Sequence, residues 1–339
     1  MEKRALIIGG SGQIGQAAAR ALLADGWRVT AAQKHPGGVP ADLLQQGVAA
    51  IAVDREEVGA VARSVHDGFD AVIDTVAYDD RDARQLLEIE GDVGAIIVIS
   101  SGSVYRDAAG RTLDEARETG FPDFPAPIGE DQPTVPPGPA TYSTRKALLE
   151  ETLLQNASRP VTILRPCAIY GPGSRHPREW WFVKRILDGR RRIPLAFLGE
   201  SRFHQSATAN IAELIRVALG NPETRVLNAA DPQALSVKEI GEAIAAAYGV
   251  DLQFELLEGP PRNGVGATPW SVAGPVVVDM SRARAMGYQA VTTYGRAVGE
   301  ACRSAEASAR ARVAFPDYIN ALFDYAAEDA ALGGQDHSH

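Results

Sequence analysis

Cysteine is scarce in this sequence, which has only Cys167 and Cys302 among its 339 residues. Two cysteines so far apart offer neither a disulfide framework nor the close ligand spacing of a metal site, so we expect no bound metal. Long hydrophobic runs are also missing, since no stretch approaches the roughly 20 apolar residues that span a membrane. The first residues have the pattern of a strand and not of a secretory signal. These absences predict a cytoplasmic protein that does not bind membranes.

Basic residues are outnumbered by acidic ones. The chain has 34 Lys and Arg residues against 43 Asp and Glu residues, which gives a net charge of −9 and a pI of about 5.3. Nucleic-acid binding normally requires a basic face, so this balance disfavours an RNA-associated protein. Apolar residues still make up 45% of the chain, which is enough for a large core. We therefore expect a small-molecule substrate and no nucleic-acid partner.

The first half of the chain alternates strand-like and helix-like segments. The strand candidates are continuous β-branched or apolar runs, which is typical of strands buried on both faces. They are Arg4–Ile8, Arg28–Ala32, Ala49–Val53, Ala71–Thr75, Ala95–Ser100 and Val161–Arg165. The helix candidates between them are Gln13–Asp25, Val39–Gln46, Val58–His66, Ala83–Gly91 and Tyr142–Asn156. Strict alternation predicts an α/β fold with a doubly wound parallel sheet.

Residues 106–140 interrupt this alternation. A series of prolines from Pro122 to Pro139 excludes a long helix there. Loops of this length inside a compact domain are usually functional or disordered. We interpret the segment as a partly ordered, proline-rich flap over the functional site, and a surface insertion without a role is the alternative.

The composition changes after the sequence Tyr170-Gly171-Pro172-Gly173. Two tryptophans, a basic run and short mixed elements replace the regular pattern. Further helices are expected at Asn210–Leu219, Ser236–Tyr248, Ser281–Met286, Tyr294–Glu306 and Asp317–Leu332. We therefore expect one domain over residues 1–170. Residues 171–332 then form mainly a second lobe, with some segments returning to the first sheet, and 333–339 form a disordered tail.

A glycine turn follows the first expected strand directly. Gly9, Gly12 and Gly15 are spaced three apart between that strand and the first expected helix. Glycine permits a tight turn and lets a pyrophosphate approach the backbone closely. The N-terminus of the following helix presents N–H groups and a partial positive charge to the phosphates. The position of this turn between strand and helix favours a dinucleotide-binding site.

Three further residues are candidates for chemistry. Tyr142 and Lys146 are four residues apart on an expected helix, so their side chains share a face. An adjacent ammonium group favours the phenolate of a tyrosine, and the pair could then transfer a proton. Ser101 follows the fifth expected strand, at the carboxyl edge where parallel sheets bind ligands. Its hydroxyl could polarise a substrate carbonyl.

These motifs occur in the order found in one enzyme family. The glycine turn, Ser101, the Tyr142–Lys146 pair and Leu164-Arg165-Pro166-x-x-x-Tyr170-Gly171-Pro172-Gly173 together resemble the extended short-chain dehydrogenase/reductase family, also called the NAD-dependent epimerase/dehydratase family. The resemblance covers residues 1 to about 300. It implies a Rossmann-type domain with a smaller C-terminal substrate-binding lobe. It also implies a catalytic triad of Ser101, Tyr142 and Lys146.

The resemblance also implies the residues that contact cofactor and substrate. Asp54 is expected at the adenine edge, and Lys146 is expected to hold the nicotinamide ribose as well. The full expected cofactor set is Gly9, Ser11, Gly12, Gln13, Ile14, Gly15, Gln33, Lys34, Asp54, Ala77, Tyr142, Lys146 and Pro166. The expected substrate contacts are Ser103, Arg175, Trp180 and Arg202. A homodimer that pairs through the Tyr142–Lys146 helix is expected over a monomer.

Two departures from the family bear on the reaction. Family members that dehydrate nucleotide sugars carry an acidic pair after the catalytic hydroxyl residue, whereas Gly102 and Ser103 follow Ser101 here. Nucleotide-sugar epimerases usually have an arginine where this chain has Phe203, and Arg202 is one place away. We therefore expect a reductase of a small or mid-sized carbonyl metabolite, with a nucleotide-sugar epimerase as the alternative. A dinucleotide-binding sensor without catalytic activity is an alternative of another class.

The end of the second expected strand bears on the cofactor. An NAD site normally has a carboxylate there, which binds the ribose 2′-hydroxyl. This strand instead leads into Gln33-Lys34-His35, and the two basic side chains could pair with a 2′-phosphate. The sequence therefore favours NADP(H) over NAD(H), and a site that accepts either cofactor is the alternative.

Overall fold

A computed structural model describes residues 2–333 of the chain. The chain divides into two compact units. The first unit contains the described residues of Met1–Cys167 together with Thr208–Ala230 and Val278–Val291. The second contains Ala168–Ala207, Asp231–Val277 and the described residues from Thr292 onward. Most of the expected tail, 334–339, lies outside the described residues.

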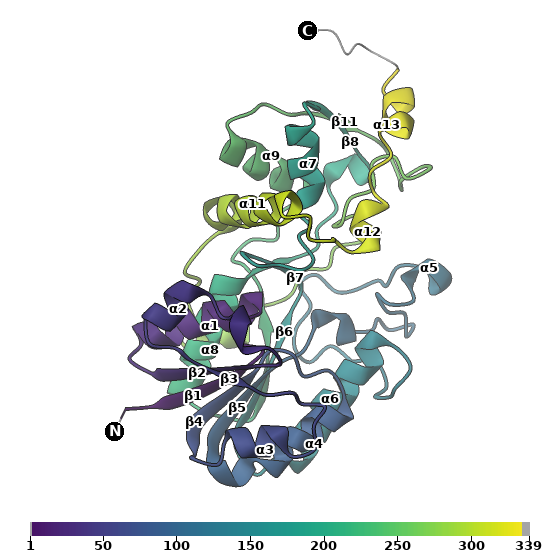
Figure 1. Cartoon of the computed structure of the whole chain (residues 1–339). Coiled ribbons are helices and arrows are strands. Elements are labelled where there is room, and N and C mark those ends of the chain that lie inside the picture. Colours follow the sequence, from purple (N-terminus) through teal and green to yellow (C-terminus); the bar gives the residue numbers. More distant parts are fainter. Residues whose placement is uncertain (1, 334–339) are drawn as a thin grey trace. The chain divides into compact units, whose positions relative to one another are not determined.

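The first unit is built on a seven-stranded parallel sheet (Figure 1). The strand order is β10-β6-β5-β4-β1-β2-β3, so the order reverses between β1 and β4. The strands are β1 (Arg4–Ile8), β2 (Arg28–Gln33), β3 (Ala49–Ala52), β4 (Phe69–Asp74), β5 (Val93–Ile99), β6 (Val161–Pro166) and β10 (Arg225–Ala229). This confirms the expected doubly wound sheet. Ligands of such sheets bind at the carboxyl ends of the strands, near the point of reversal.

Helices cover both faces of this sheet (Figure 1). α1 packs beside α8 on one face, and α4 packs beside α6 on the other. The helices of this unit are α1 (Gln13–Ala24), α2 (Ala41–Gln45), α3 (Ala60–Ser64), α4 (Asp80–Glu88), α5 (Ala116–Thr119), α6 (Tyr142–Asn156), α8 (Thr208–Gly220) and α10 (Ser281–Ala285). Short 3-10 turns occur at η1 (Pro36–Gly38), η2 (Glu90–Asp92) and η3 (Gly102–Val104). Because both faces are covered, every residue of β6 is buried, including the polar Thr162 and the charged Arg165.

Local capping explains where two helices depart from the expected bounds. α3 begins at Ala60 and not at Val58, because Gly59 adopts a left-handed conformation with φ of +73° and Val58 is almost fully exposed. α4 begins at Asp80, three residues before the expected Ala83. The side chain of Asp79 accepts a hydrogen bond from the Arg81 N–H and caps this helix.

The proline-rich segment 106–140 has a single short helix, α5, and is held by side chains. Asp107 is buried and accepts hydrogen bonds from the backbone N–H groups of Ala109, Arg111 and Asp123. Asp114 accepts a hydrogen bond from the Ser143 N–H in the first turn of α6, at 2.8 Å. The segment is thus attached to the helix that carries the Tyr–Lys pair.

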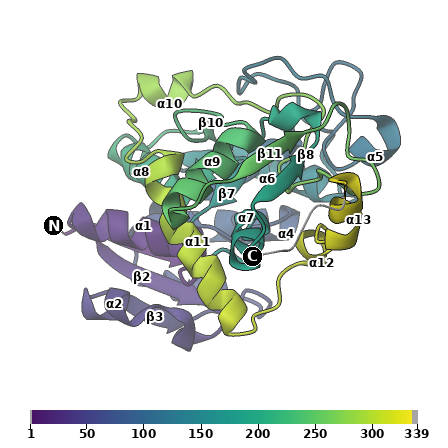
Figure 2. The same cartoon turned by 90° about the horizontal axis from the view of Figure 1, so that it is seen from above.

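The second unit contains two small parallel pairs of strands, β7 (Ala168–Tyr170) with β9 (Gln205–Ala207) and β8 (Arg192–Leu195) with β11 (Gln253–Leu256). Its helices are α7 (Trp180–Leu187), α9 (Val237–Tyr248), α11 (Tyr294–Arg310), α12 (Asp317–Asn320) and α13 (Tyr325–Ala331), with a 3-10 turn at η4 (Phe197–Gly199). Figure 2 shows α9 beside α11, and these two helices pack against each other. Aromatic residues on α7 form the centre of this core, where Trp181 and Phe182 are fully buried.

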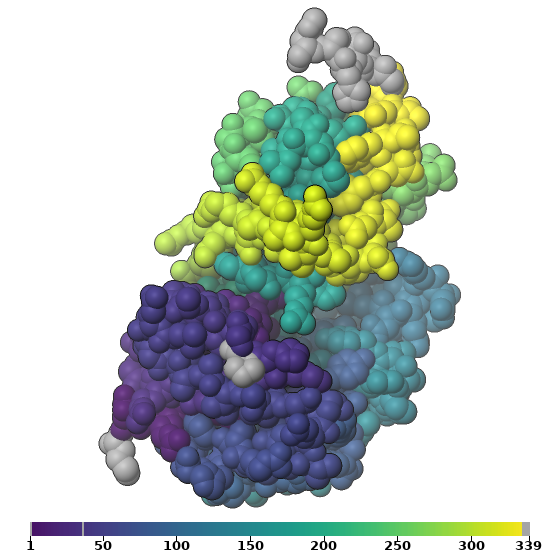
Figure 3. Space-filling model, viewed as in Figure 1, coloured from purple at the N-terminus to yellow at the C-terminus, as the bar shows by residue number. Residues whose placement is uncertain are grey.

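The single helix expected over Asp317–Leu332 is wrong, because the segment forms two helices, α12 and α13. Asp324 caps a new helix by accepting a hydrogen bond from the Ala327 N–H, so the chain restarts there. Arg185 of α7 binds the intervening turn through the Leu322 carbonyl and forms an ion pair with Glu328. The C-terminal residues, yellow in Figure 3, follow the surface of the second unit.

No helix within residues 2–333 is both long and apolar enough to cross a bilayer.

The second unit contains a buried acid. Glu179 precedes α7 and is 2% exposed, and the hydroxyl of Tyr294 lies 3.4 Å from its carboxylate. Burial raises the pKa of Glu179 from its ordinary 4.5 to about 7.

The raised pKa of Glu179 predicts a pH-dependent stability. Between about pH 4.5 and 7 the folded chain binds the proton that the unfolded chain releases, so this residue lowers stability as the pH rises. Glu179→Gln removes the titration. We expect thermal scans to give this variant a Tm a few degrees above the wild type at pH 8 and close to the wild type at pH 5. Glu300→Gln, an exposed change on α11, is the control. An equal shift at both pH values would contradict the prediction.

Candidate active site

The glycine turn between β1 and α1 forms an open cradle. Gly9 has φ of +84°, and a Cβ there would lie 2.4 Å from the Thr75 hydroxyl oxygen. A Cβ on Gly15 would lie 2.4 Å from the Gly9 carbonyl oxygen, so both positions require glycine for the turn itself. Gly12 differs, because a Cβ there would meet only the Gly9 oxygen, at 3.3 Å. Its bare face is therefore open to a ligand.

The first turn of α1 also has donors to offer. Gly12 is the N-cap residue, and no side chain caps the helix. Uncapped N–H groups at a helix N-terminus bind anions such as a pyrophosphate. The side-chain oxygen of Gln13 is buried and has no hydrogen-bond partner among the described residues. The turn, with Ser11 beside it and Ile14 buried below it, thus fits the dinucleotide that the sequence predicts.

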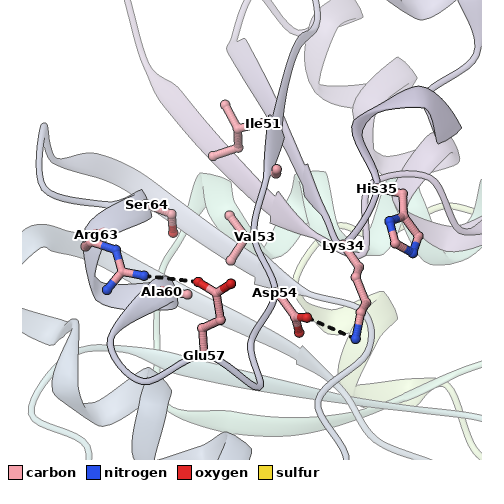
Figure 4. A pocket seen from close by; sticks show the side chains of 10 residues that line it. Lys34, His35, Ile51, Val53, Asp54, Glu57, Ala60, Arg63 and Ser64 are labelled. Carbon is pink, nitrogen blue, oxygen red and sulfur yellow. Dashed lines mark hydrogen bonds and ion pairs between the residues drawn. The ribbon is translucent and has the colours of Figure 1, made fainter.

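A pocket of about 490 Å³ lies between the ends of β2 and β3 and helix α3 (Figure 4). Lys34 and Asp54 face each other there, and their charged atoms are 2.9 Å apart. The hydrogen bond between them raises the pKa of Lys34 and lowers that of Asp54. Val53 and Ala60 supply apolar surface. The two residues expected at the adenosine end of a cofactor are therefore neighbours, and Gln33 precedes them at the buried end of β2.

Ser101 stands at the carboxyl end of β5 and begins the turn η3. Its side chain accepts a hydrogen bond from the Ser103 N–H at 3.1 Å. Gly102 lets this turn lie against the end of β6, because a Cβ there would be 2.8 Å from the Cys167 sulfur and 3.4 Å from the Pro166 carbonyl oxygen. This close contact between Gly102 and the end of β6 positions the Ser101 side chain at the carboxyl end of the sheet.

Tyr142 and Lys146 begin α6, as expected. A capping box formed by Thr141 and Thr144 sets the start of this helix. Tyr142 is 44% exposed, while Lys146 is buried with its Nζ 5.9 Å from the centre of the Tyr142 ring. The ammonium group donates hydrogen bonds to the carbonyl oxygens of Ala77, at 2.5 Å, and Ile99, at 3.0 Å. The lysine is thus held at the carboxyl ends of β4 and β5.

The two side chains titrate away from their ordinary ranges. Burial lowers the pKa of Lys146 to about 8, although the carboxylates of Asp74 and Glu150 oppose this effect. Loss of surrounding water raises the pKa of Tyr142, and a hydrogen bond with the Ser101 hydroxyl lowers it by less. The phenol therefore stays protonated at neutral pH, as a proton donor must.

The structure brings Ser101, Tyr142, Lys146 and Ala77 together in the first unit. Ser103 is close by, and its hydroxyl oxygen accepts a hydrogen bond from Ser143 at 2.9 Å. The other expected substrate residues belong to the second unit. There Arg175 is exposed and Trp180 packs edge-on against Phe315. Arg202 is bound to the Ala234 carbonyl and to Glu239.

The sequence analysis did not identify the buried charges behind the triad. Glu150 lies one helical turn after Lys146 and is 3% exposed. It accepts a hydrogen bond from Ser100 at 2.5 Å and forms an ion pair with Arg165 on β6. The spacing of four from Lys146 was a usable signal, since it places both residues on one face of α6. No sequence spacing indicated that Arg165 pairs with Glu150, because only the fold brings β6 beside α6.

The parallel sheet with a glycine turn after its first strand is typical of dinucleotide-binding enzymes. A profile of the NAD dependent epimerase/dehydratase family matches residues 5–230. The chain belongs to this family, which is the extended short-chain dehydrogenase/reductase type that its motifs resemble. The family assignment from the sequence is thus confirmed.

Two curated proteins are similar in sequence. One is the chloroplast stem-loop binding protein of 41 kDa b from Arabidopsis thaliana, 28% identical over 262 residues, which cover 73% of this chain and 64% of that protein. The other is 2′-dehydrokanamycin reductase from Streptomyces kanamyceticus, 37% identical over 114 residues, 33% of this chain and 32% of that protein. The matches thus span less than two thirds of either relative's length.

Solved structures show the same fold. The dTDP-glucose 4,6-dehydratase of Bacillus anthracis, in complex with NAD, has a TM-score of 0.67 at 15% identity and covers 91% of this chain and 98% of its own. The UDP-glucose 4-epimerase of Thermus thermophilus, also with NAD, has a TM-score of 0.64 at 20% identity and covers 89% and 98%. At this identity the likeness establishes the fold alone.

The position of Tyr142 predicts a specific loss on mutation. Tyr142→Phe removes the hydroxyl that can donate a proton, so kcat should fall by roughly 10²–10⁴-fold, while cofactor affinity should barely change. Lys146→Ala should reduce both. Tyr78→Phe is the matched control, because that ring lies 5.8 Å from the Tyr142 ring and the change keeps the ring. Turnover of a carbonyl substrate and cofactor titration would be measured. Near-normal turnover in Tyr142→Phe would show that the tyrosine is not the proton donor.

Proposed function

We propose that this protein is an NADP(H)-preferring oxidoreductase that reduces the carbonyl group of a small or mid-sized metabolite to an alcohol. The observation that carries the proposal is the grouping of Ser101, Tyr142 and the buried Lys146 at the sheet edge where parallel folds bind ligands. The open glycine cradle stands at the same edge, beside the reversal of strand order.

The triad residues have distinct roles in this reaction. Ser101 and Tyr142 hydrogen-bond the substrate carbonyl oxygen and polarise it. Tyr142 transfers its phenolic proton to that oxygen as the alcohol forms. The Lys146 ammonium stabilises the phenolate that remains, since an adjacent positive charge favours the ionised tyrosine. A nicotinamide dinucleotide, when bound, supplies the hydride that completes the reduction. Gly12 and the first turn of α1 hold its pyrophosphate.

Two features support a reductase over a nucleotide-sugar enzyme. Gly102 and Ser103 replace the acidic pair of the dehydratases, and the Ser103 side chain accepts a hydrogen bond from the Ser143 hydroxyl. Phe203 replaces the arginine of the epimerases, and Arg202 is engaged by Glu239 and the Ala234 carbonyl. The likeness to 2′-dehydrokanamycin reductase, a protein named as a reductase, supports the same choice.

A nucleotide-sugar epimerase is the second candidate. The solved structures of this fold include a dTDP-glucose 4,6-dehydratase and UDP-glucose 4-epimerases. An RNA-binding role is suggested only by the name of the chloroplast relative. The net charge of −9 opposes it, because RNA binding depends on positive charge at the phosphates.

The Lys34–Asp54 pair predicts the cofactor preference. Lys34 would bind the 2′-phosphate of NADPH through a charge-assisted hydrogen bond that NADH cannot form. Lys34→Ala should therefore weaken NADPH binding more than NADH binding. Asp54→Asn removes the carboxylate that holds Lys34 at 2.9 Å, so it should strengthen NADPH binding relative to NADH. Titration of both reduced dinucleotides checks this. Wild-type affinity that is equal or higher for NADH would overturn the preference.

A ligand panel tests the substrate class. Carbonyl metabolites, UDP, dTDP and a structured RNA would be added to the protein in the presence of NADP(H). A ligand at 100 times its Kd adds about 2.7 kcal/mol to the folded state, so binding raises Tm. We expect stabilisation by one or more carbonyl compounds and none by the nucleotides or RNA. Stabilisation by UDP or dTDP, with none by a carbonyl compound, would favour the epimerase. Salt-sensitive binding of the RNA would favour the RNA-binding role.

A further inference from the structure

A buried carboxylate lies behind the catalytic lysine. Asp74 ends β4 and is fully buried. Its carboxylate is 3.1 Å from a guanidinium nitrogen of Arg55, which follows β3. The same guanidinium group is 2.9 Å from the carboxylate of Asp82 on α4. Arg55 is only 14% exposed in its side chain, so these three residues form one buried ion cluster, which we call the charge cluster.

The charge cluster fixes the turn that follows β4. Asp74 accepts hydrogen bonds from the N–H groups of Val76, at 2.9 Å, and Ala77, at 2.7 Å. Asp82 accepts one from the Tyr78 N–H at 2.7 Å. Three consecutive backbone donors are therefore held by two carboxylates, and Arg55 holds the carboxylates. Hydrogen bonds to charged acceptors of this kind are about twice as strong as neutral ones.

The same turn contacts both titrating members of the triad. The carbonyl oxygen of Ala77 accepts a hydrogen bond from Lys146 Nζ at 2.5 Å, and the N–H of the same residue donates to Asp74. The ring of Tyr78 lies 5.8 Å from that of Tyr142. A displacement of this turn would thus move the acceptor of the lysine and the neighbour of the tyrosine together.

The charges that face Lys146 come from several elements. Asp74 on β4, Asp82 on α4 and Glu150 on α6 itself favour the ammonium form, and Arg55 opposes it. Arg165 neutralises Glu150 by direct pairing. The charge cluster has two carboxylates and one guanidinium, so it leaves one net negative charge to balance the buried ammonium. An uncompensated ammonium at this depth would lose its proton more readily.

We propose that Arg55, Asp74 and Asp82 are positioning residues, which hold the Ala77–Tyr78 turn and set the charge at Lys146. The proposal rests on the proposed role of the Ser101–Tyr142–Lys146 triad. Its test measures the apparent pKa of Lys146 in the protein without cofactor or substrate, so the result does not depend on whether the reaction is a reduction.

The test is competitive acetylation of the lysines with acetic anhydride from pH 6.5 to 10.5, read by mass spectrometry of the Lys146 peptide. Asp74→Asn keeps the shape of the side chain and one acceptor oxygen but removes the negative charge. The apparent pKa of Lys146 should therefore fall by roughly one pH unit. Arg55→Gln removes the positive charge, so that pKa should rise. Glu151→Gln, an exposed change on α6, is the matched control and should leave it unchanged.

Opposite shifts of the Lys146 pKa in Asp74→Asn and Arg55→Gln would show that the cluster acts through its charge and not only by supporting the turn. A purely structural role would loosen the turn in both, and Lys146 would then move toward its ordinary pKa of 10.5 in both. That result, or no shift in either folded variant, would overturn the proposal. Asp82→Asn provides a second carboxylate variant if Asp74→Asn does not fold, and its Lys146 pKa should also fall. With a substrate, Asp74→Asn should lower kcat more than it raises KM.

Discussion

The burial of one ammonium group constrains the whole site. Lys146 is 6% exposed, yet it must keep its charge to act on Tyr142 in the proposed reaction. A buried charge is tolerated only where polar groups replace the lost water. The carbonyl oxygens of Ala77 and Ile99 do this, and both stand where parallel strands β4 and β5 have ended. The sheet, and not the helix that carries the lysine, therefore determines where the charge can stand.

Much of this arrangement could be predicted from the sequence, for a physical reason. Strands buried on both faces must be apolar throughout, so they can be recognised without knowing their neighbours. The Tyr142–Lys146 pair lies within one helical turn, and the glycine turn is contiguous, so their geometry is local. By contrast, Asp74 and Arg55 are 19 residues apart, and Glu150 and Arg165 lie on different elements. Which charges meet across a sheet depends on strand order, and no local pattern encodes that.

The bounds that were wrong have local causes that compete with periodicity. The apolar spacing between 317 and 332 favours one helix, but Asp324 caps a second one within it, and Arg185 binds the carbonyl of Leu322 in the break. A cap and a buried guanidinium each supply a partner that a continuous helix would not need. The expected substrate contacts are the residues that sequence reasoning reaches least well, because a side chain such as Arg202 has several partners and only the fold selects among them.

Asp54 and Arg55 are adjacent in the sequence but lie in different surroundings. Asp54 pairs with Lys34, whose side chain is 59% exposed, and exposed pairs contribute little free energy. Arg55 pairs with the fully buried Asp74, and loss of one partner from such a pair is costly. Lys34 and Asp54 can therefore change with little effect on folding, whereas Arg55 cannot. Because the two positions are consecutive but differently solvated, the proposed cofactor preference can change at Lys34 or Asp54 while the buried ion pair between Arg55 and Asp74 stays fixed.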